Sequence, residues 1–282
     1  STRLVGLVGA LLLGMTPTFL RWSVEGHPDL PQLFWILCCL TCCVAMCRGL
    51  SLKQTMLASI FAGLAFGTKY AGGFLLPVIA ASALLPSADG HFSLRTGLDR
   101  LRNRTALIAL GSIPAFFIVG FAVTNPFALA RLGEFIHSLE VEREIMAFGH
   151  TSRVDVGGLA WLWLLADVAG RANAVILALS LAAGSWYVVR RRRLASISGI
   201  LLVWIALFLG YLVLESSLRR TRHLLPVLPV LFVFLAQAYR AIWAEAKGRL
   251  PGRSVVHLIL PLLILGLSWG RLAATIDLFE QK

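Results

Sequence analysis

Long apolar runs recur from one end of this chain to the other, and they constrain its fold more than any other feature. Each run holds about 15–20 residues, roughly the length of helix that crosses a bilayer. Composition supports the same conclusion: 58% of the 282 residues are hydrophobic, mean hydropathy is +0.80 and only 14% are charged, against about 25% in a soluble domain. We therefore predict an all-α, polytopic transmembrane helical bundle, formed as a single domain by residues 1–282.

About nine crossings fit the apolar runs. They are residues 4–20, 32–47, 54–68, 71–86, 105–124, 172–189, 197–214, 223–240 and 254–272. The first run begins almost at once, without a Met, a charged n-region or a cleavage site, so no signal peptide is recognised. We expect that an N-terminal part of the membrane domain precedes this chain.

Basic residues are distributed asymmetrically about these crossings. With the N-terminus in the cytoplasm, the cytoplasmic loops hold 15 of the 26 Lys and Arg residues but only 3 of the 14 acids. The whole net charge of +12 is then cytoplasmic, as the positive-inside rule requires, and it suits anionic membrane lipids. The charge therefore does not indicate nucleic acid as a partner. We expect an integral protein of a bacterial cytoplasmic membrane.

One cationic cluster lies on the opposite, outer side, where Lys and Arg are usually sparse. Arg219, Arg220 and Arg222 fall in the predicted loop between crossings 197–214 and 223–240. An anionic substrate at the membrane surface, most simply a phosphate, would explain them, because Arg binds phosphate through several charge-assisted donors. The alternative is that these side chains only extend from the interface to water.

Two other predicted outer segments place charged residues beside helix ends. Asp29 lies between two prolines at the start of the second crossing, with His27 two residues before it. It is either a helix-capping carboxylate or an acid that faces a substrate or metal. Lys69 follows residues 54–68, which form only about 22 Å of helix against a hydrocarbon core of about 30 Å. Lys69 is thus expected near the headgroup level, where it either extends to water or meets an anion.

Two further patterns are expected to serve packing. Gly63 and Gly67 are four residues apart, which is typical of closely packed membrane helices. Five cysteines lie on the second crossing: Cys38, Cys39, Cys42, Cys43 and Cys47. We expect them to pack as small apolar residues, because that helix offers no His or acid ligands and cysteines on one helix do not easily meet disulfide geometry.

The longest predicted polar region is an outer loop at residues 125–171. Residues 127–148 are predicted to form an amphipathic helix, and residues 158–168 an apolar segment too short to span. Both are expected to lie in the interface plane, together forming a partial lid. His150, between them, is either an ordinary surface residue or one that faces the substrate.

Four motifs, taken in order, resemble the lipid-carrier-dependent glycosyltransferases of the GT-C fold, family 39-like, relatives of protein O-mannosyltransferases and aminoarabinose transferases. They are residues 16–31, ending in His27-Pro28-Asp29-Leu30-Pro31; residues 63–77, with Thr68-Lys69-Tyr70; residues 125–150, starting Asn125-Pro126-Phe127; and residues 222–229, Arg222-His223-Leu224-Leu225-Pro226-Val227-Leu228-Pro229. The order and spacing fit nearly the whole chain. His223 stands where the family has Tyr.

This resemblance implies transfer of a sugar from a polyprenyl-phosphate donor to a lipid, glycan or protein acceptor at the outer membrane face, with inversion at the anomeric carbon. By the resemblance, the lipid phosphate is bound by Lys69, Tyr70, Arg222 and His223, with Arg219 and Arg220 as second choices. The residues that face the substrate are His27, Asp29 and His150. Asp29 resembles a second family acid, while the catalytic carboxylate itself is expected in an outer loop upstream. A divalent metal stays open as a cofactor, and no metal ligand is assigned.

Two other classes of protein remain open. A transporter would place paired ionisable residues in the middle of the membrane, or show internal repeats or broken helices. The predicted crossings show neither feature. A non-catalytic scaffold subunit also remains open, because the Asp-Glu motif expected of the family is missing from this sequence.

Overall fold

The computed structural model describes residues 2–85, 102–148, 158, 160–190, 197–216 and 220–249. Every element within these ranges is a helix, which confirms the all-α prediction. The chain divides into two compact units, each built from separate segments. The first unit comprises Ser1–His27, Leu159–Ala183 and Arg220–Lys282; the second comprises Pro28–Gly158 and Gly184–Arg219.

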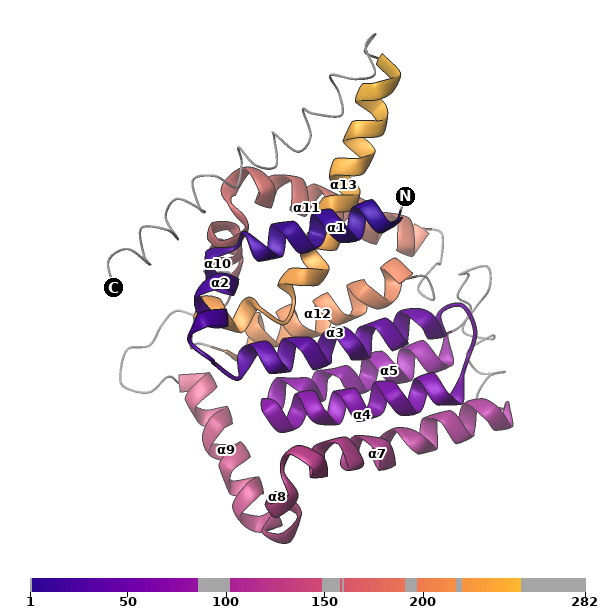
Figure 1. Cartoon of the computed structure of the whole chain (residues 1–282), viewed down its shortest axis with the longest axis vertical. Coiled ribbons are helices and arrows are strands. Elements are labelled where there is room, and N and C mark those ends of the chain that lie inside the picture. The colour runs from indigo at the N-terminus through magenta and orange to yellow at the C-terminus, as the bar shows by residue number, and fades with distance from the viewer. Residues whose placement is uncertain are drawn as a thin grey trace. The chain divides into compact units, whose positions relative to one another are not determined.

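Four helices of the second unit lie side by side (Figure 1). They are α3 (Asp29–Met46), α4 (Leu52–Thr68), α5 (Leu75–Leu84) and α7 (Arg104–Thr124). A further helix of this unit, α12 (Ile197–Glu215), contacts α3 and α5. Fully buried apolar side chains such as Ile36, Ala62 and Val78 fill the space between the helices. Cys39 and Cys43 on α3 are buried as well, as is Cys47 directly after it, and all five cysteines are free thiols.

The connection from α4 to α5 is a tight turn that contains a 3₁₀ helix, η1 (Tyr70–Phe74). Helix α4 ends at Thr68, and Lys69 adopts an extended backbone that redirects the chain. Gly72 then approaches the backbone of α4 so closely that an added Cβ would lie 2.3 Å from the nitrogen of Phe66. The helices predicted at 54–68 and 71–86 are thus joined by a short turn, but the second α-helix begins at Leu75 rather than at 71, because the first turn after Lys69 is 3₁₀.

Glycine allows α4 and α7 to pack backbone against backbone. A Cβ on Gly63 would lie 2.1 Å from the carbonyl oxygen of Phe117, and one on Gly120 would lie 2.2 Å from that of Ile60. At Gly67 the same Cβ would meet the side chains of Thr124 and Asn125, whose amide donates a 2.7 Å hydrogen bond to the Gly67 carbonyl. The close packing predicted from Gly63 and Gly67 is therefore present, and its partner is α7.

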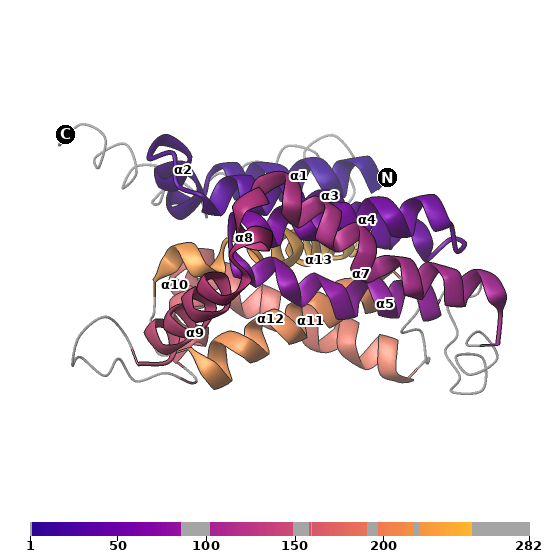
Figure 2. The same cartoon turned by 90° about the horizontal axis from the view of Figure 1, so that it is seen from below.

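The segment after α7 forms two helices rather than the single helix predicted for residues 127–148. They are α8 (Pro126–Ala130) and α9 (Leu132–Phe148), and the chain turns sharply between them at Arg131 (Figure 2). No residue of α9 is buried, yet the ring of Phe135 packs against Phe66, Tyr70 and Phe121. The side chain of Phe135 thus joins α9 to α4, η1 and α7.

The first unit is built from α1 (Thr2–Gly14), α2 (Pro17–Val24), α10 (Ala160–Ala169), most of α11 (Arg171–Arg190), η2 (Thr221–Leu224) and α13 (Leu228–Arg249). Helix α1 packs on α13, and η2 contacts both α2 and α10. Two side-chain hydrogen bonds join α11 to α13: the hydroxyl of Ser180 donates to the carbonyl of Phe234 at 3.0 Å, and that of Tyr239 donates to Asn173 at 2.5 Å.

Prolines account for two differences from the predicted crossings. The first run, predicted as one span over residues 4–20, breaks into α1 and α2, which meet at an angle of 65°. Pro17 lacks an N–H and holds Thr16 in an extended conformation, so it starts a new helix instead of continuing the old one. The expectation that no helix is broken was therefore wrong. The crossing predicted to start at 223 also differs, because residues 221–224 are 3₁₀ and α13 begins only at Leu228, just before Pro229.

Among the residues that the structure describes, four helices are long and apolar enough to cross a membrane: Asp29–Met46, Arg104–Thr124, Asn173–Arg190 and Ile197–Glu215. The bent pair α1 and α2 makes a fifth if it counts as one span. The protein is thus an integral membrane protein, while the larger number of nine crossings stays a prediction. The crossing predicted at 254–272 lies outside the described residues.

Substitution of Gly63 tests the contact between α4 and α7. We expect Gly63→Ala to lower the stability of the detergent-solubilised protein by about 1–3 kcal/mol, as overpacking does. In a helix that had space for it, the same change would raise stability by up to about 1 kcal/mol. Gly111→Ala on α7 is the matched control, since no described atom outside its own stretch of helix lies within 4 Å of its Cβ position. Equal melting temperatures for the two variants would contradict the packing described.

Candidate functional site

The first turn of α3 presents two buried polar side chains on one face. Asp29 and Gln32 are three residues apart in the helix, so their side chains are neighbours. Both residues are fully buried. Pro28 and Pro31 fit here because the first N–H groups of a helix have no partner within it. A carboxylate at this end is also favoured by the helix dipole.

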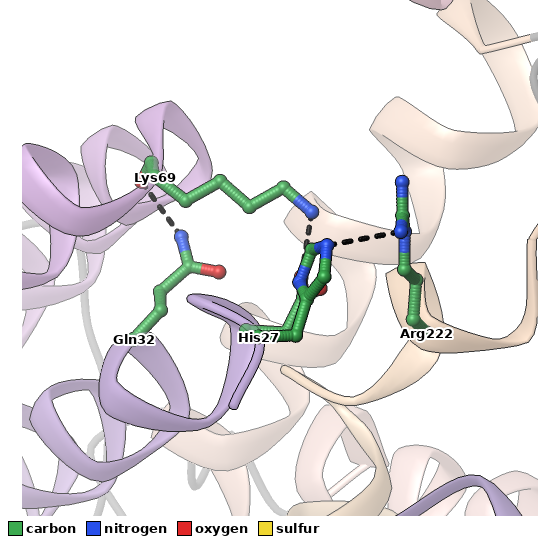
Figure 3. A network of polar contacts seen from close by, with 5 residues as sticks. His27, Gln32, Lys69 and Arg222 are labelled. Carbon is green, nitrogen blue, oxygen red and sulfur yellow. Dashed lines mark hydrogen bonds and ion pairs between the residues drawn. The ribbon is translucent and has the colours of Figure 1, made fainter. Parts of the chain in front are cut away.

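Lys69 meets both of these side chains from the end of α4, and Figure 3 shows its contact with Gln32. Its ammonium nitrogen lies 2.6 Å from Oδ1 of Asp29, and the Gln32 amide donates a 2.7 Å hydrogen bond to the carbonyl oxygen of Lys69. Only 1% of the Asp29 side chain is exposed, against 26% of the Lys69 side chain. We name Asp29, Gln32 and Lys69 the carboxylate–lysine cluster.

This pairing explains how a partly buried lysine is accommodated. A charge removed from water is costly unless a partner of opposite charge and further hydrogen bonds compensate it. The sequence predicted that Lys69 would meet either water or an anion, and in the structure its nearest anion is the protein's own Asp29. An ammonium group has three donors, so Lys69 retains donors for a second acceptor on its exposed side.

A second group of polar side chains lies within the first unit, at η2 and the end of α2. The guanidinium of Arg222 lies over the ring of Trp22, with its carbon 5.1 Å from the ring centroid, and its Nη1 lies 3.0 Å from Nε2 of His27 (Figure 3). The rings of Trp22 and His27 meet edge to face at 5.0 Å. We name Trp22, His27 and Arg222 the arginine cluster.

The chemistry of arginine fixes the direction of the contact with His27. Guanidinium has five donors and no acceptor, so Nε2 of His27 accepts the hydrogen bond and carries no proton in this arrangement. Two buried donors of the cluster, Nε of Arg222 and Nε1 of Trp22, have no hydrogen-bond partner among the residues that the structure describes. Both could donate to an oxygen-rich ligand such as a phosphate.

The other predicted site residues occupy separate positions. His223 is buried and its ring stacks on that of Trp161 from α10, at 6.2 Å between centroids. Tyr70 packs between Phe66 and Phe135. Arg220 is exposed and precedes η2, while Arg219 and His150 lie outside the described residues. Among the residues described, no group of three or more His, Cys, Asp or Glu could hold a metal ion.

Sequence reasoning did not identify two of the side chains that build these clusters, nor the aromatic partner of His223. Gln32 was counted only as the first residue of a crossing, Trp22 was given no role in a site, and Trp161 was only part of a short apolar segment. A signal for Gln32 did exist, since a polar residue one turn after a carboxylate shares its helix face. Nothing local marks Trp161, because its partner His223 is 62 positions further along the chain.

The comparison with protein-family models adds an independent finding. Residues 2–125 match the family described as dolichyl-phosphate-mannose-protein mannosyltransferase. The match covers less than half of the chain; it includes the carboxylate–lysine cluster and ends before Arg222. No curated protein and no solved structure matched the chain.

A double-mutant cycle measures the ion pair of the carboxylate–lysine cluster. We expect Lys69→Met to lower the stability by about 2 kcal/mol, because it leaves the buried Asp29 carboxylate without its cation; partial exposure of Lys69 keeps this below the 3–5 kcal/mol of a fully buried pair. In the Asp29→Asn background the same change should cost less than half as much. Equal costs in both backgrounds, read from denaturation midpoints in detergent, would show that the two charges do not stabilise each other.

Proposed function

We propose that this protein is a membrane glycosyltransferase that takes its sugar from a polyprenyl-phosphate carrier. The observation that carries the proposal is the match of residues 2–125 to a family of lipid-phosphate-dependent mannosyltransferases, on a chain with several helices able to span a membrane. The four ordered motifs point to the same class, and the last of them extends beyond the matched region to Pro229.

The reaction sets two requirements on the side chains. An acceptor hydroxyl attacks the anomeric carbon, its proton leaves to a base, and the bond from that carbon to the lipid phosphate breaks. A carboxylate is suited to take or orient the proton, and cations are suited to stabilise the charge that develops on the departing phosphate. Asp29 fits the role of an acid near the donor, while Lys69 and Arg222 fit the role of phosphate-binding cations.

The geometry of each cluster is compatible with these roles. Lys69 donates one of its three N–H groups to Asp29, and Arg222 donates one of its five to His27. Both cations can therefore still bind phosphate oxygens. Helix ends hold both residues: Lys69 caps α4 and Arg222 lies in η2. We place the reaction on the outer face of the membrane by the positive-inside rule.

Binding of polyprenyl phosphate to the purified protein tests the proposal. We expect the wild type to bind, and Lys69→Ala and Arg222→Ala each to bind at least about tenfold more weakly, since a hydrogen bond to a charged group contributes about 1.5–3 kcal/mol. Lys69→Arg should bind more tightly than Lys69→Ala because it keeps the charge. Isothermal titration in detergent measures all four proteins.

The control is Arg131→Ala, which removes an exposed cation from the join of α8 and α9 and should leave the affinity unchanged. The proposal is wrong if the wild type does not bind the lipid phosphate. It is also wrong if the alanine variants, folded as judged by their melting temperatures, bind as tightly as the wild type. Either result would favour a transporter or a scaffold subunit.

A further inference from the structure

An apolar groove runs between α5 and α7 in the second unit. It has a volume of about 500 Å³, and every described residue that lines it is apolar. Ile113 is buried at its floor, while Pro77, Pro114 and Ile118 are exposed at its edges. Binding sites for small molecules typically have volumes of about 300–1,000 Å³, so the groove is large enough for part of a lipid chain.

A proline within α7 explains why the two helices leave this space. Pro114 lies in the middle of α7 and has no N–H, so the carbonyl of Leu110 one turn earlier loses its usual helical partner. Both residues line the groove, and opposite them α5 contributes Leu76, the ring of Pro77 and a short side chain at Ala80. The helices therefore contact each other elsewhere along their length without filling this part.

The surroundings of the groove indicate a lipid chain as its occupant. Helix α7 is one of the four candidate spans, and apolar side chains on its surface are freely exposed, 51% for Leu107, 50% for Ile118 and 72% for Val123. In a membrane these side chains contact hydrocarbon. An apolar groove offers water no hydrogen-bond partners, and an empty one loses dispersion contacts.

The groove is also linked to the carboxylate–lysine cluster. Phe117 lines the groove, its ring lies 5.4 Å from that of Phe66, and Phe66 lies 5.7 Å from Tyr70, the residue after Lys69. On the α5 side, η1, about 10 Å long at the 3₁₀ rise of about 2 Å per residue, and Leu75 separate Lys69 from the groove residue Leu76. A lipid whose anionic headgroup meets Lys69 could therefore place the start of its chain in the groove.

We propose that the groove between α5 and α7 binds the isoprenoid chain of the donor lipid. The proposal rests on the function proposed above, since the matched family is described by a dolichyl phosphate and dolichyl is a long isoprenoid. Transfer of the chain from the bilayer to the groove exchanges one apolar environment for another, so affinity comes from packing rather than from the hydrophobic effect. Its role is to orient the phosphate and the attached sugar.

Site-specific photo-crosslinking tests the position of the chain. Ile118 and Val119 are neighbours on α7 and equally exposed, 50% and 51%, but only Ile118 lines the groove. With a photoreactive phenylalanine analogue at either position, we expect radiolabelled polyprenyl phosphate to crosslink at 118 at least about fivefold more than at 119. A labelled phosphatidylglycerol should crosslink equally at both. Equal labelling by polyprenyl phosphate, or preferential labelling by phosphatidylglycerol at 118, would overturn the proposal.

Filling the groove gives a second test that uses chain length. We expect Ala80→Phe to weaken binding of a long-chain polyprenyl phosphate about tenfold, equivalent to about 1.4 kcal/mol, and to leave binding of a two-isoprene phosphate unchanged. Ala115→Phe is the control, because Ala115 is exposed on α7 and does not line the groove.

The two tests separate this proposal from the function on which it rests. If the wild type binds neither phosphate, both are wrong. If the wild type binds both and Ala80→Phe weakens neither or both alike, the groove does not hold the chain, while the proposed function stands. Crosslinking in the otherwise wild-type protein gives the answer even if Ala80→Phe does not fold.

Discussion

The ion pair between Asp29 and Lys69 is the interaction around which the second unit is organised. It joins the start of α3 to the end of α4, and Gln32 strengthens the same junction by binding the Lys69 carbonyl. A largely buried ion pair is stable only if its two groups are held in good geometry. That condition is met by the backbone contact of Gly63 with α7 on one side and by the tight turn at Gly72 on the other.

In the first unit, the cation at a helix end is Arg222, and aromatic side chains hold it in place. Arg222 and His223 are adjacent but point to different helices, one to Trp22 at the end of α2 and the other to Trp161 of α10. The 3₁₀ turn that presents them precedes Pro226 and Pro229, where the chain begins α13. In both units a cation is therefore held at a helix end by aromatic or acidic side chains. This is the arrangement expected for binding an anionic headgroup, in which the protein supplies preorganised donors.

Local sequence patterns predicted the helices and the polar residues at their ends. They did not predict which residues far apart in the sequence contact each other. Hydropathy indicated helices such as α4, α7 and α12 because burial in lipid depends on each residue's own side chain. Gly63 and Gly67 predicted close packing but not α7 as the partner, and nothing in the sequence joined Lys69 to an acid 40 positions earlier. The break at Pro17 was missed because averaging over an apolar run hides the one residue that cannot continue the hydrogen-bond ladder. The chain likewise turns at Arg131, although the apolar periodicity of residues 127–148 alone favours a single helix.

Transfer of the sugar itself is the most direct test of the account. Membranes that contain the wild-type protein, the Asp29→Asn variant or neither would be supplied with polyprenyl phosphates carrying radiolabelled hexoses or pentoses. The account predicts that the wild type moves label from the lipid carrier to an acceptor and that Asp29→Asn does so at least about tenfold more slowly, because it removes the carboxylate that positions Lys69 and a hydrogen bond to a charged group contributes about 1.5–3 kcal/mol. Label that stays on the carrier equally in all three membranes, for every sugar supplied, would contradict it.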